Sequence, residues 1–236
     1  MSELFKTLVA ANRILAHEGV VDAYGHVSVR SPAAPARFFM SRSRSPELVS
    51  LGDILEFGAD GEAVDSSPPP VYAERFIHAA IYEARLDVHA VVHSHAYDVL
   101  PFTVTGVPLR PIFHSAARIG VDVPVWDIGK RFGATNFLVT DMEKGRDLVR
   151  ALGDNRVVLM RGHGVTVTGS TLHNAVVTSI YTQVNARLQM LSMQLGPVAY
   201  LSPDEVKVAG DMEAKGRLGA DRTWEYLKQR AGCADL

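Results

Sequence analysis

The sequence predicts an α/β protein in which helices and short strands alternate. Apolar residues recur at helical spacing near the N-terminus, from Leu4 to Leu15, and again from Leu172 to Leu195. Two short apolar runs, Val88–Val92 and Val157–Met160, have the length of buried strands. The chain has 236 residues, of which 47% are hydrophobic and 21% charged, so it can bury a sizeable core. We expect a single domain over residues 1–236.

Charge and composition argue against several classes of partner. Lysine and arginine total 24 and aspartate and glutamate 26, and no run of basic residues occurs, so we expect neither a nucleic-acid nor a membrane partner. No apolar stretch approaches the roughly 20 residues of a membrane span, and Met1–Lys6 lacks signal-peptide order, which favours a cytoplasmic protein. Cys233 is the single cysteine and can form neither an internal disulfide nor a thiolate zinc site.

The first elements are a helix and several short strands. The first helix should end at Gly19, which suits a left-handed cap. In His26–Arg30 valines alternate with polar residues, as in a strand with two different faces. Phe38–Met40 forms a second short strand. Ile54–Phe57 opens a hairpin, because Asp60-Gly61 supplies the positive φ angles that a tight reversal needs.

The middle of the chain contains a helix and two less regular stretches. Three consecutive prolines precede a helix predicted from about Tyr72 to Leu86, in which Glu74 and His78 share one face as residues i and i+4. Val99–Val107 is predicted to be irregular, since a proline and a glycine interrupt it. Val121–Trp126 resembles a strand whose proline favours the edge of a sheet.

The remaining segments contain clear helix starts and one strand pair. A capping box at Thr140 and Glu143 opens a helix that runs to Leu152. The strands Val157–Met160 and Val165–Thr168 follow, joined by Gly162-His163-Gly164, and then a long helix Leu172–Leu195. A last helix starts at Ser202-Pro203, with Glu205 completing its cap.

Histidines follow two of the predicted strands. His93 and His95 end the apolar run Val88–Val92, and the two-residue period of a strand puts both on one side of the chain. They could bind a metal together, or they could be hydrogen-bonded histidines at a strand end. His163 after a second strand and Glu74 on a neighbouring helix favour the metal. Three imidazoles and one carboxylate leave a position for substrate, as in a catalytic site.

Polar residues in two other stretches are candidates for ligand contacts. Ser41-Arg42-Ser43-Arg44-Ser45 alternates hydroxyls and guanidinium groups, which is typical of a solvated turn but would also suit a carboxylate or phosphate. The polar face of His26–Arg30 could be exposed to solvent, or it could face a ligand. The residues alone leave these alternatives open.

The order and spacing of four motifs resemble the class II aldolase/adducin family. The motifs are Gly25-His26-Val27-Ser28, Glu74 to His78, His93-Ser94-His95 and Gly162-His163-Gly164. The resemblance covers nearly the whole chain. It implies a three-layer α/β/α fold with a mostly antiparallel central sheet, and a homotetramer with sites at subunit interfaces. It also implies a divalent metal held by His93, His95 and His163, with Glu74 as a further ligand or as the acid/base.

Departures from the aldolase pattern narrow the implied chemistry. Sugar-phosphate aldolases of this family carry Gly-Asn where this chain has Gly25-His26, and a serine pair where it has Tyr72-Ala73. That pair helps to hold the substrate phosphate, so its loss disfavours a phosphorylated sugar. Where such aldolases have a catalytic tyrosine, this chain has His114, whose imidazole can deliver a proton near neutral pH.

Two stretches, Phe39–Val49 and Arg110–His114, resemble the decarboxylase branch of the family, which acts on hydroxylated aromatic or muconate-type carboxylates. The resemblance implies a carboxy-lyase acting on a hydroxylated pyridine or benzene dicarboxylate, and we favour 3-hydroxy-2-methylpyridine-4,5-dicarboxylate of vitamin B6 degradation. Manganese or zinc would bind the substrate hydroxyl, and Glu74 or His114 would supply the proton that replaces carbon dioxide. The candidates for gripping the second carboxylate are His26, Ser28, Ser41, Arg42 and Ser43.

Two other functions fit the same motifs. One is a metal-dependent aldolase or epimerase that acts on a sugar or hydroxy-carbonyl substrate. The other is a non-catalytic, adducin-like interaction module. Modules of that kind tend to lose the metal histidines, whereas His93, His95 and His163 are all present here.

Overall fold

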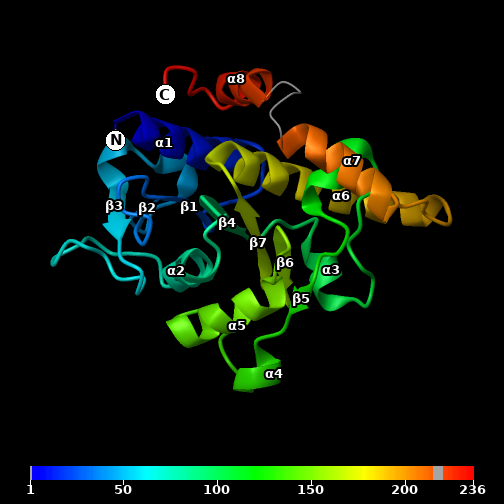
Figure 1. Ribbon diagram of the computed structural model, residues 1–236, viewed down its shortest axis with the longest axis horizontal. Helices are drawn as coiled ribbons and strands as arrows, with labels where there is room; N and C mark the ends of the chain where they lie inside the picture. Colours follow the sequence, from blue (N-terminus) through cyan, green and yellow to red (C-terminus); the bar gives the residue numbers. More distant parts are fainter. Residues whose placement is uncertain (1, 215–219) are drawn as a thin grey trace.

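A computed structural model describes residues 2–214 and 220–236, and within these residues seven strands form one sheet (Figure 1). Their spatial order is β3-β2-β1-β4-β7-β6-β5. All neighbouring strands run antiparallel except β5 and β6, which are parallel. The strands are β1 His26–Arg30, β2 Phe38–Ser41, β3 Ile54–Phe57, β4 Ala90–Ser94, β5 Val125–Trp126, β6 Val157–Met160 and β7 Gly164–Gly169.

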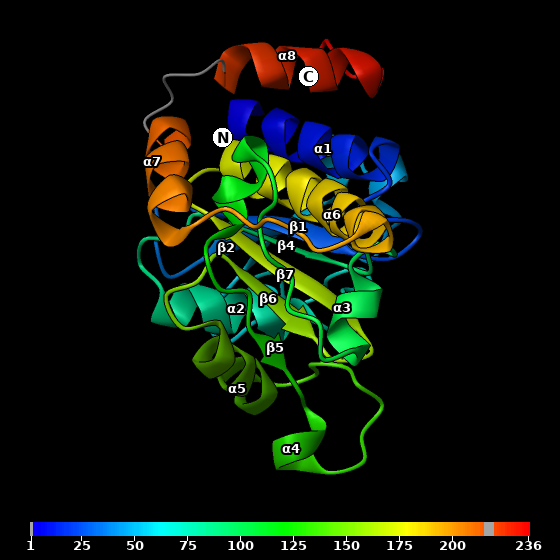
Figure 2. The same cartoon turned by 90° about the vertical axis from the view of Figure 1, so that its right-hand side faces the viewer.

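Helices cover both faces of the sheet, which gives the three layers that the family resemblance implied (Figure 2). α1 and α6 lie on one face, with α8 outside α1, and α2 and α5 lie on the other face. The helices are α1 Ser2–His17, α2 Arg75–Ala84, α3 Leu100–Val104, α4 Gly129–Phe132, α5 Met142–Leu152, α6 Leu172–Leu195, α7 Pro203–Ala214 and α8 Ala220–Arg230. Short 3₁₀ helices span Pro46–Leu48, Leu51–Asp53 and His114–Ile119.

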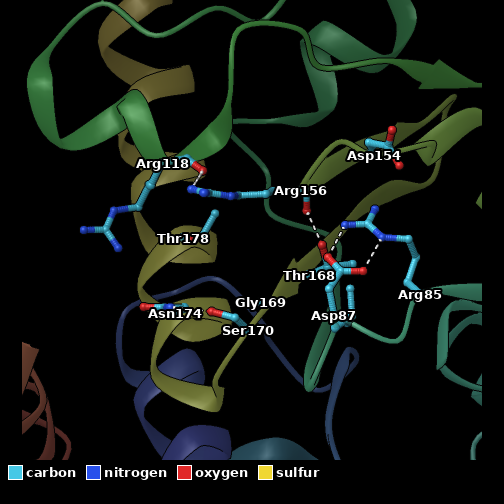
Figure 3. A pocket seen from close by; sticks show the side chains of 11 residues that line it. Arg85, Asp87, Arg118, Asp154, Arg156, Thr168, Gly169, Ser170, Asn174 and Thr178 are labelled. Atoms are coloured by element: carbon cyan, nitrogen blue, oxygen red, sulfur yellow. Dashed lines mark hydrogen bonds and ion pairs between the residues drawn. The ribbon is translucent and has the colours of Figure 1, made fainter. Parts of the chain in front are cut away.

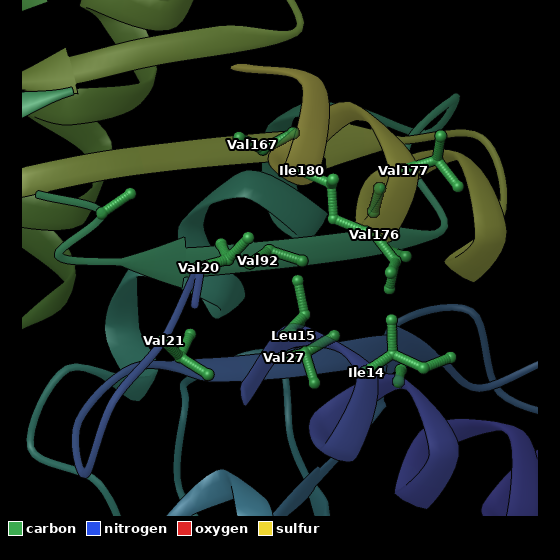
Figure 4. Packing of buried hydrophobic residues seen from close by; sticks show 14 of the residues in the cluster. Ile14, Leu15, Val20, Val21, Val27, Val92, Val167, Val176, Val177 and Ile180 are labelled. Atoms are coloured by element: carbon green, nitrogen blue, oxygen red, sulfur yellow. The ribbon is translucent and has the colours of Figure 1, made fainter. Parts of the chain in front are cut away.

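Alternation along the strands separates two hydrophobic cores. Val27 of β1 and Val92 of β4 point toward α1 and α6, where Ile14 and Val176 pack against them (Figure 4). The next residue back along β4, Val91, belongs to the core beneath α2 and α5. Because both faces of the sheet are covered, all five residues of β1 are buried, including the polar ones. Exposure to solvent, one of the two alternatives for this polar face, is therefore wrong.

Several predicted boundaries are confirmed. The first helix ends just before Gly19, whose φ is +68°, and α6 spans Leu172–Leu195 as expected. The Ser202–Glu205 capping box opens α7, with the Ser202 N–H donating to the Glu205 carboxylate at 2.7 Å. No helix in residues 2–214 and 220–236 is long and apolar enough to cross a membrane.

Other boundaries were predicted wrongly, for identifiable reasons. α2 begins at Arg75 rather than near Tyr72, so Glu74 precedes the helix as its N-cap residue. The cap of α5 is Asp141, whose carboxylate accepts the Lys144 N–H at 2.9 Å, and not Thr140.

Three other segments also differ from the prediction. The segment Val99–Val107, expected to be irregular, contains the short helix α3. Its proline lies in the first turn, where backbone N–H groups make no hydrogen bond within the helix, so the lack of an N–H costs nothing there. The strand predicted at Val88–Val92 is displaced to Ala90–Ser94, so His93 lies within it. The strand expected over Val121–Trp126 is reduced to two residues at the sheet edge, after the proline.

Arg30 fastens the end of β1 to the layer that carries α2. Its guanidinium is buried and donates to the carbonyl oxygens of Pro35, Tyr82, Arg85 and Val88. A buried cation that donates to several carbonyls replaces its lost hydration with protein hydrogen bonds. This contact therefore fixes β1 relative to α2, which in turn positions His26.

We predict that Arg30→Ala lowers the free energy of unfolding by about 3 kcal/mol, because several buried carbonyls lose their donor at once. Urea titration measures this change. Arg37→Ala is the control, since Arg37 is half exposed and only contacts Glu56 at 3.5 Å, and its effect should stay below about 1 kcal/mol. Equal losses in the two variants would contradict this role of Arg30.

Candidate active site

The four predicted metal ligands meet at one end of the central strands. β4 carries His93, and His95 follows directly after it. β7 pairs with β4 so that Thr166 lies opposite His93, which brings His163, in the turn before β7, beside the end of β4. Glu74 reaches the same point from the residue before α2. Three separate segments thus bring the carboxylate and the imidazoles together.

The distances between these side chains suit a single bound ion. His95 Nε2 lies 3.1 Å from His163 Nε2, and Glu74 Oε2 lies 3.4 Å from His163 Nε2 and 3.6 Å from His93 Nε2. One ligand atom from each of the four residues lies within 4.8 Å of all the others. Two nitrogens at zinc-ligand distance from one tetrahedral ion would be about 3.3 Å apart. The four residues could therefore hold a divalent metal.

The protonation states also suit a metal. Burial lowers the pKa of His93, and burial together with the neighbouring histidines lowers the pKa of His95 to about 4, so both rings are neutral with a free lone pair. Burial alone would raise the pKa of Glu74, but His163 and His93 hold it well below its usual range. His93 Nε2 is buried without a hydrogen-bond partner among the described residues, and a cation would satisfy it.

Contacts behind the cluster orient its ligands. Glu74 Oε1 accepts the backbone N–H of Val139 at 2.9 Å, which leaves Oε2 for the histidines. Gly164 allows the chain to approach β4, since a Cβ there would lie 2.3 Å from the Ser94 carbonyl oxygen and 3.1 Å from His95 Cδ2. Gly164, the second glycine of the Gly162-His163-Gly164 motif, is therefore needed for the close packing of His163 and His95.

A cavity of about 420 Å³ opens beside the cluster. Its lining is mostly apolar in surface, with imidazoles, hydroxyls and one guanidinium among the lining residues. The lining residues are Ala23, Tyr24, Gly25, His26, Ser43, Arg44, Ser45, Tyr72, Ala73, Glu74, His93, His95 and Leu138. The volume suits a small ring with polar substituents.

Only two of the predicted carboxylate-gripping residues line this cavity, His26 and Ser43. Ser28 is buried behind it and contacts His78 and Tyr82. Ser41 is also buried, with its hydroxyl 3.4 Å from the Tyr72 hydroxyl. These two serines are therefore placed to support residues of the lining and not to contact a ligand in the cavity.

Arg42 does not line the cavity either. Its Nε donates to Asp53 Oδ1 at 2.6 Å. Arg44, two residues further along the loop, is the guanidinium in the lining. Its Nη1 donates to both oxygens of Asp53, which leaves Nε and Nη2 for other contacts. Asp53 thus orients both arginines, and the loop register decides which one faces the cavity.

His114 lies away from the cluster within this chain. It is exposed in the 3₁₀ helix His114–Ile119 and borders a different cavity of about 760 Å³, together with Tyr181 of α6 and Val208 of α7. A role for His114 at the cluster would therefore require a second copy of the chain.

Three further side chains near the cluster were not among the predicted site residues. Tyr72 lines the cavity, and its hydroxyl donates to the Arg44 carbonyl oxygen. His78 and Tyr82 form a buried hydrogen-bonded chain with Ser28 behind His26. A helical period places His78 and Tyr82 on one face of α2, which was the available signal.

A further cavity, of about 320 Å³, lies at the opposite end of the sheet (Figure 3). Arg85 beside it is held by Asp87 and by the carbonyl oxygens of Gly153 and Asn155. Thr168 donates to the Arg156 carbonyl oxygen. None of the predicted site residues lines this cavity, so the chemistry is concentrated at the histidine end.

Comparison with known proteins gives the family. Residues 6–190 match the family described as Class II Aldolase and Adducin N-terminal domain. The chain belongs to this family. The resemblance and the fold class predicted from the sequence are thereby confirmed.

Three similar proteins illustrate the range of the family. The chain is 40% identical over 207 residues to the decarboxylase tropJ of Talaromyces stipitatus, covering 82% of this chain and 78% of the relative. It is 30% identical over 248 residues to a 3,4-dihydroxyphthalate decarboxylase of Terrabacter sp., covering 96% and 97%. An L-fuculose 1-phosphate aldolase structure from Glaciozyma antarctica, at 23% identity, has a TM-score of 0.78 over 98% of this chain and 90% of that chain, which shows a shared fold.

We predict that acid destabilises the metal-free protein through its buried histidines. Burial lowers the pKa of His78 from 6.5 to about 3, so between these pH values the unfolded chain binds a proton here and the folded chain does not. Stability therefore falls as the pH decreases below about 6.5, and between pH 6.5 and 5 His78 alone accounts for about 1.5 kcal/mol.

Urea unfolding at these two pH values checks this expectation. His78→Asn should reduce the pH dependence by about that amount. The exposed His89 is the control, and His89→Asn should keep the dependence of the unmodified protein. The same dependence in His78→Asn as in the unmodified protein would contradict the assignment.

Proposed function

We propose that this protein is a divalent-metal-dependent decarboxylase of a hydroxylated aromatic dicarboxylate. The observation that carries the proposal is the convergence of His93, His95, His163 and Glu74 beside a cavity that Arg44 also lines. Such a site offers a metal position and an anchor for an anion. The relatives named as decarboxylases, one of them for 3,4-dihydroxyphthalate, support a carboxy-lyase activity.

The reaction requires stabilisation of the negative charge that develops on the substrate oxygen beside the reacting carbon. Decarboxylation breaks a carbon–carbon bond, its electron pair passes toward the ring and the ortho oxygen, and a proton takes the place of carbon dioxide. Manganese or zinc held by the three histidines and Glu74 would supply Lewis acidity toward that oxygen. Imidazole and carboxylate ligands suit either ion.

Glu74 and His114 have different parts in this proposal. The low pKa of Glu74 keeps its carboxylate ionised, which favours a ligand role over proton donation. His114 would then deliver the proton, from a neighbouring copy in a homotetramer with sites at subunit interfaces. Its exposure and its position on a surface cavity are consistent with such a contact.

The second carboxylate would lie against Arg44, Ser43 and His26. These three residues line the cavity on the side of the loop after β2 and of the start of β1. A guanidinium with free N–H groups is a strong partner for a carboxylate. Tyr72-Ala73 borders the same cavity, where the family's sugar-phosphate aldolases carry a serine pair, and this difference disfavours a phosphate.

Decarboxylation by the metal-loaded protein tests the proposal. Manganese- and zinc-loaded samples are given a panel that includes 3,4-dihydroxyphthalate and 3-hydroxy-2-methylpyridine-4,5-dicarboxylate, and released carbon dioxide is measured. We expect turnover of at least one member, lost on chelation and lowered at least about 100-fold in His93→Ala. His89→Ala, an exposed histidine before the same strand, should retain full activity.

Other results would point elsewhere. Turnover that persists after complete metal removal would contradict the metal role. Aldehyde release from hydroxy-carbonyl substrates, with no carbon dioxide from the panel, would establish the aldolase or epimerase alternative. A protein that binds no metal would favour the interaction module.

We also predict that Arg44 anchors the substrate. Arg44→Ala should raise the KM of a dicarboxylate substrate about tenfold or more with a smaller change in kcat, because a charge-assisted contact is lost. Arg42→Ala is the matched control, since both side chains bind Asp53 but only Arg44 lines the cavity. An equal KM increase in both variants would mean that the loop, and not Arg44, matters.

A further inference from the structure

A chain of hydrogen bonds leads from the cavity into the space between β1 and α2. His26 Nδ1 lies 2.6 Å from His78 Nε2, and His78 Nδ1 lies 2.6 Å from Ser28 Oγ. Ser28 Oγ in turn lies 2.8 Å from the Tyr82 hydroxyl. All four residues are buried, and His26 is the member that lines the cavity. This chain of hydrogen bonds therefore has one end at the cavity and the other in the core.

The hydrogens along this chain can point in only two directions. A neutral imidazole carries one N–H, and only one hydrogen can occupy the contact between two ring nitrogens. If His78 is protonated on Nε2, it donates to His26 Nδ1, and the hydrogen of His26 is on Nε2. If His78 is protonated on Nδ1, His26 must carry its hydrogen on Nδ1. The two rings therefore have coupled tautomers.

Burial keeps both rings neutral. His26 is 4% and His78 0% exposed, so neither ring has the hydration that a second proton would need. A doubly protonated ring in either position would put an uncompensated charge in the core.

The end of this hydrogen-bond chain in the core decides between the two directions. The Tyr82 hydroxyl is buried, and Ser28 Oγ is its side-chain partner in the described part of the chain. If Ser28 donates to Tyr82, the tyrosine hydrogen has no acceptor there. If Tyr82 donates to Ser28, every hydrogen in the chain has an acceptor, up to His26 Nε2 at the cavity. An unpaired buried donor is costly, so the second direction is favoured.

The neighbouring cation does not change this result. Arg30 lies over the Tyr82 ring, with its Cζ 4.7 Å from the ring centre, but its N–H groups donate to backbone carbonyls. A guanidinium offers no acceptor for the tyrosine hydrogen. The direction therefore depends on which acceptor receives the Ser28 hydroxyl hydrogen.

We propose that Tyr82, Ser28 and His78 fix His26 as its Nε2–H tautomer, so that His26 presents a neutral hydrogen-bond donor to the cavity and selects a substrate with a carboxylate at that position. Ser28, His78 and Tyr82 are positioning residues, since they act through His26. The carboxylate preference rests on the proposed function, whereas the tautomer does not. A group that can only donate, such as an ammonium, would find no acceptor on His26.

Nitrogen NMR tests the tautomer without any turnover. The full chain is labelled with ¹⁵N-histidine and loaded with zinc, which is not paramagnetic. Long-range proton–nitrogen correlations distinguish protonated from unprotonated ring nitrogens, and His26→Asn and His78→Asn assign the signals. We expect a protonated Nε2 and an unprotonated Nδ1 in both rings. A protonated His26 Nδ1 would overturn the proposal.

Two substitutions test what fixes the tautomer. Ser28→Ala removes the donor to His78, so signals of the second tautomer should appear. Tyr82→Phe should keep the tautomer of the unmodified protein, because the Ser28 hydroxyl hydrogen then still has His78 Nδ1 as an acceptor and no longer has Tyr82. Ser179→Ala is the control, a buried serine on α6 whose hydroxyl donates to the Ala175 carbonyl oxygen, and it should change neither ring. Unchanged tautomers in Ser28→Ala would show that the hydrogen bonds through Ser28 do not fix them.

Phthalate, an unreactive dicarboxylate, tests the donor role. Added to the zinc-loaded protein, it should shift the His26 Nε2–H signal, and its dissociation constant should rise about tenfold in Ser28→Ala. Benzylammonium, whose charged group can only donate, should leave the signal in place. Phthalate binding that does not move this signal, or no binding, would overturn the carboxylate preference. Neither measurement needs carbon dioxide release, so failure of the proposed function would be recognised separately.

Discussion

The antiparallel pairing of β4 with β1 on one side and β7 on the other is the constraint on which the site depends. This register sets His26 opposite His93 and Thr166 opposite His93. The turn before β7 then holds His163 against His95. A shift of one residue in either pairing would turn these side chains to the other face of the sheet. Backbone hydrogen bonds, fixed by two apolar cores, therefore define the ligand geometry.

The polar groups at this end of the sheet are arranged in two layers with different tasks. The layer at the cavity, His93, His95 and Glu74, has free lone pairs and a buried carboxylate, an arrangement that a cation would stabilise. The layer behind it, His78, Ser28 and Tyr82, satisfies its own hydrogen-bonding groups. Buried polar groups without partners are unfavourable, so the satisfied layer belongs to the core while the unsatisfied one points to a ligand.

Local patterns predicted the elements well and their ends less well. Helical spacing and a glycine at the end gave α1, and α6 agreed at both ends, because a long segment repeats its helical spacing over several turns. α2 starts three residues later than predicted. The prolines before it restrict the backbone, and the side chains of Tyr72 and Glu74 make hydrogen bonds to the distant residues Arg44 and Val139. In the loop after β2, nothing local distinguishes Arg42 from Arg44. Both guanidinium groups bind Asp53, and the register of the folded loop places Arg44 at the cavity.

The sequence by itself determined the family, the fold class and the set of histidines and glutamate that meet at the cavity, because motif order and strand period are properties of the chain. Only the tertiary structure decided that Ser28 and Ser41 lie behind the lining, that Arg44 takes the place expected for Arg42, and that His114 lies at another cavity. The physical reason is that side-chain direction in loops and on buried strand faces depends on which partners the rest of the fold brings within hydrogen-bonding distance, and those partners are 10 to 50 or more residues away along the chain.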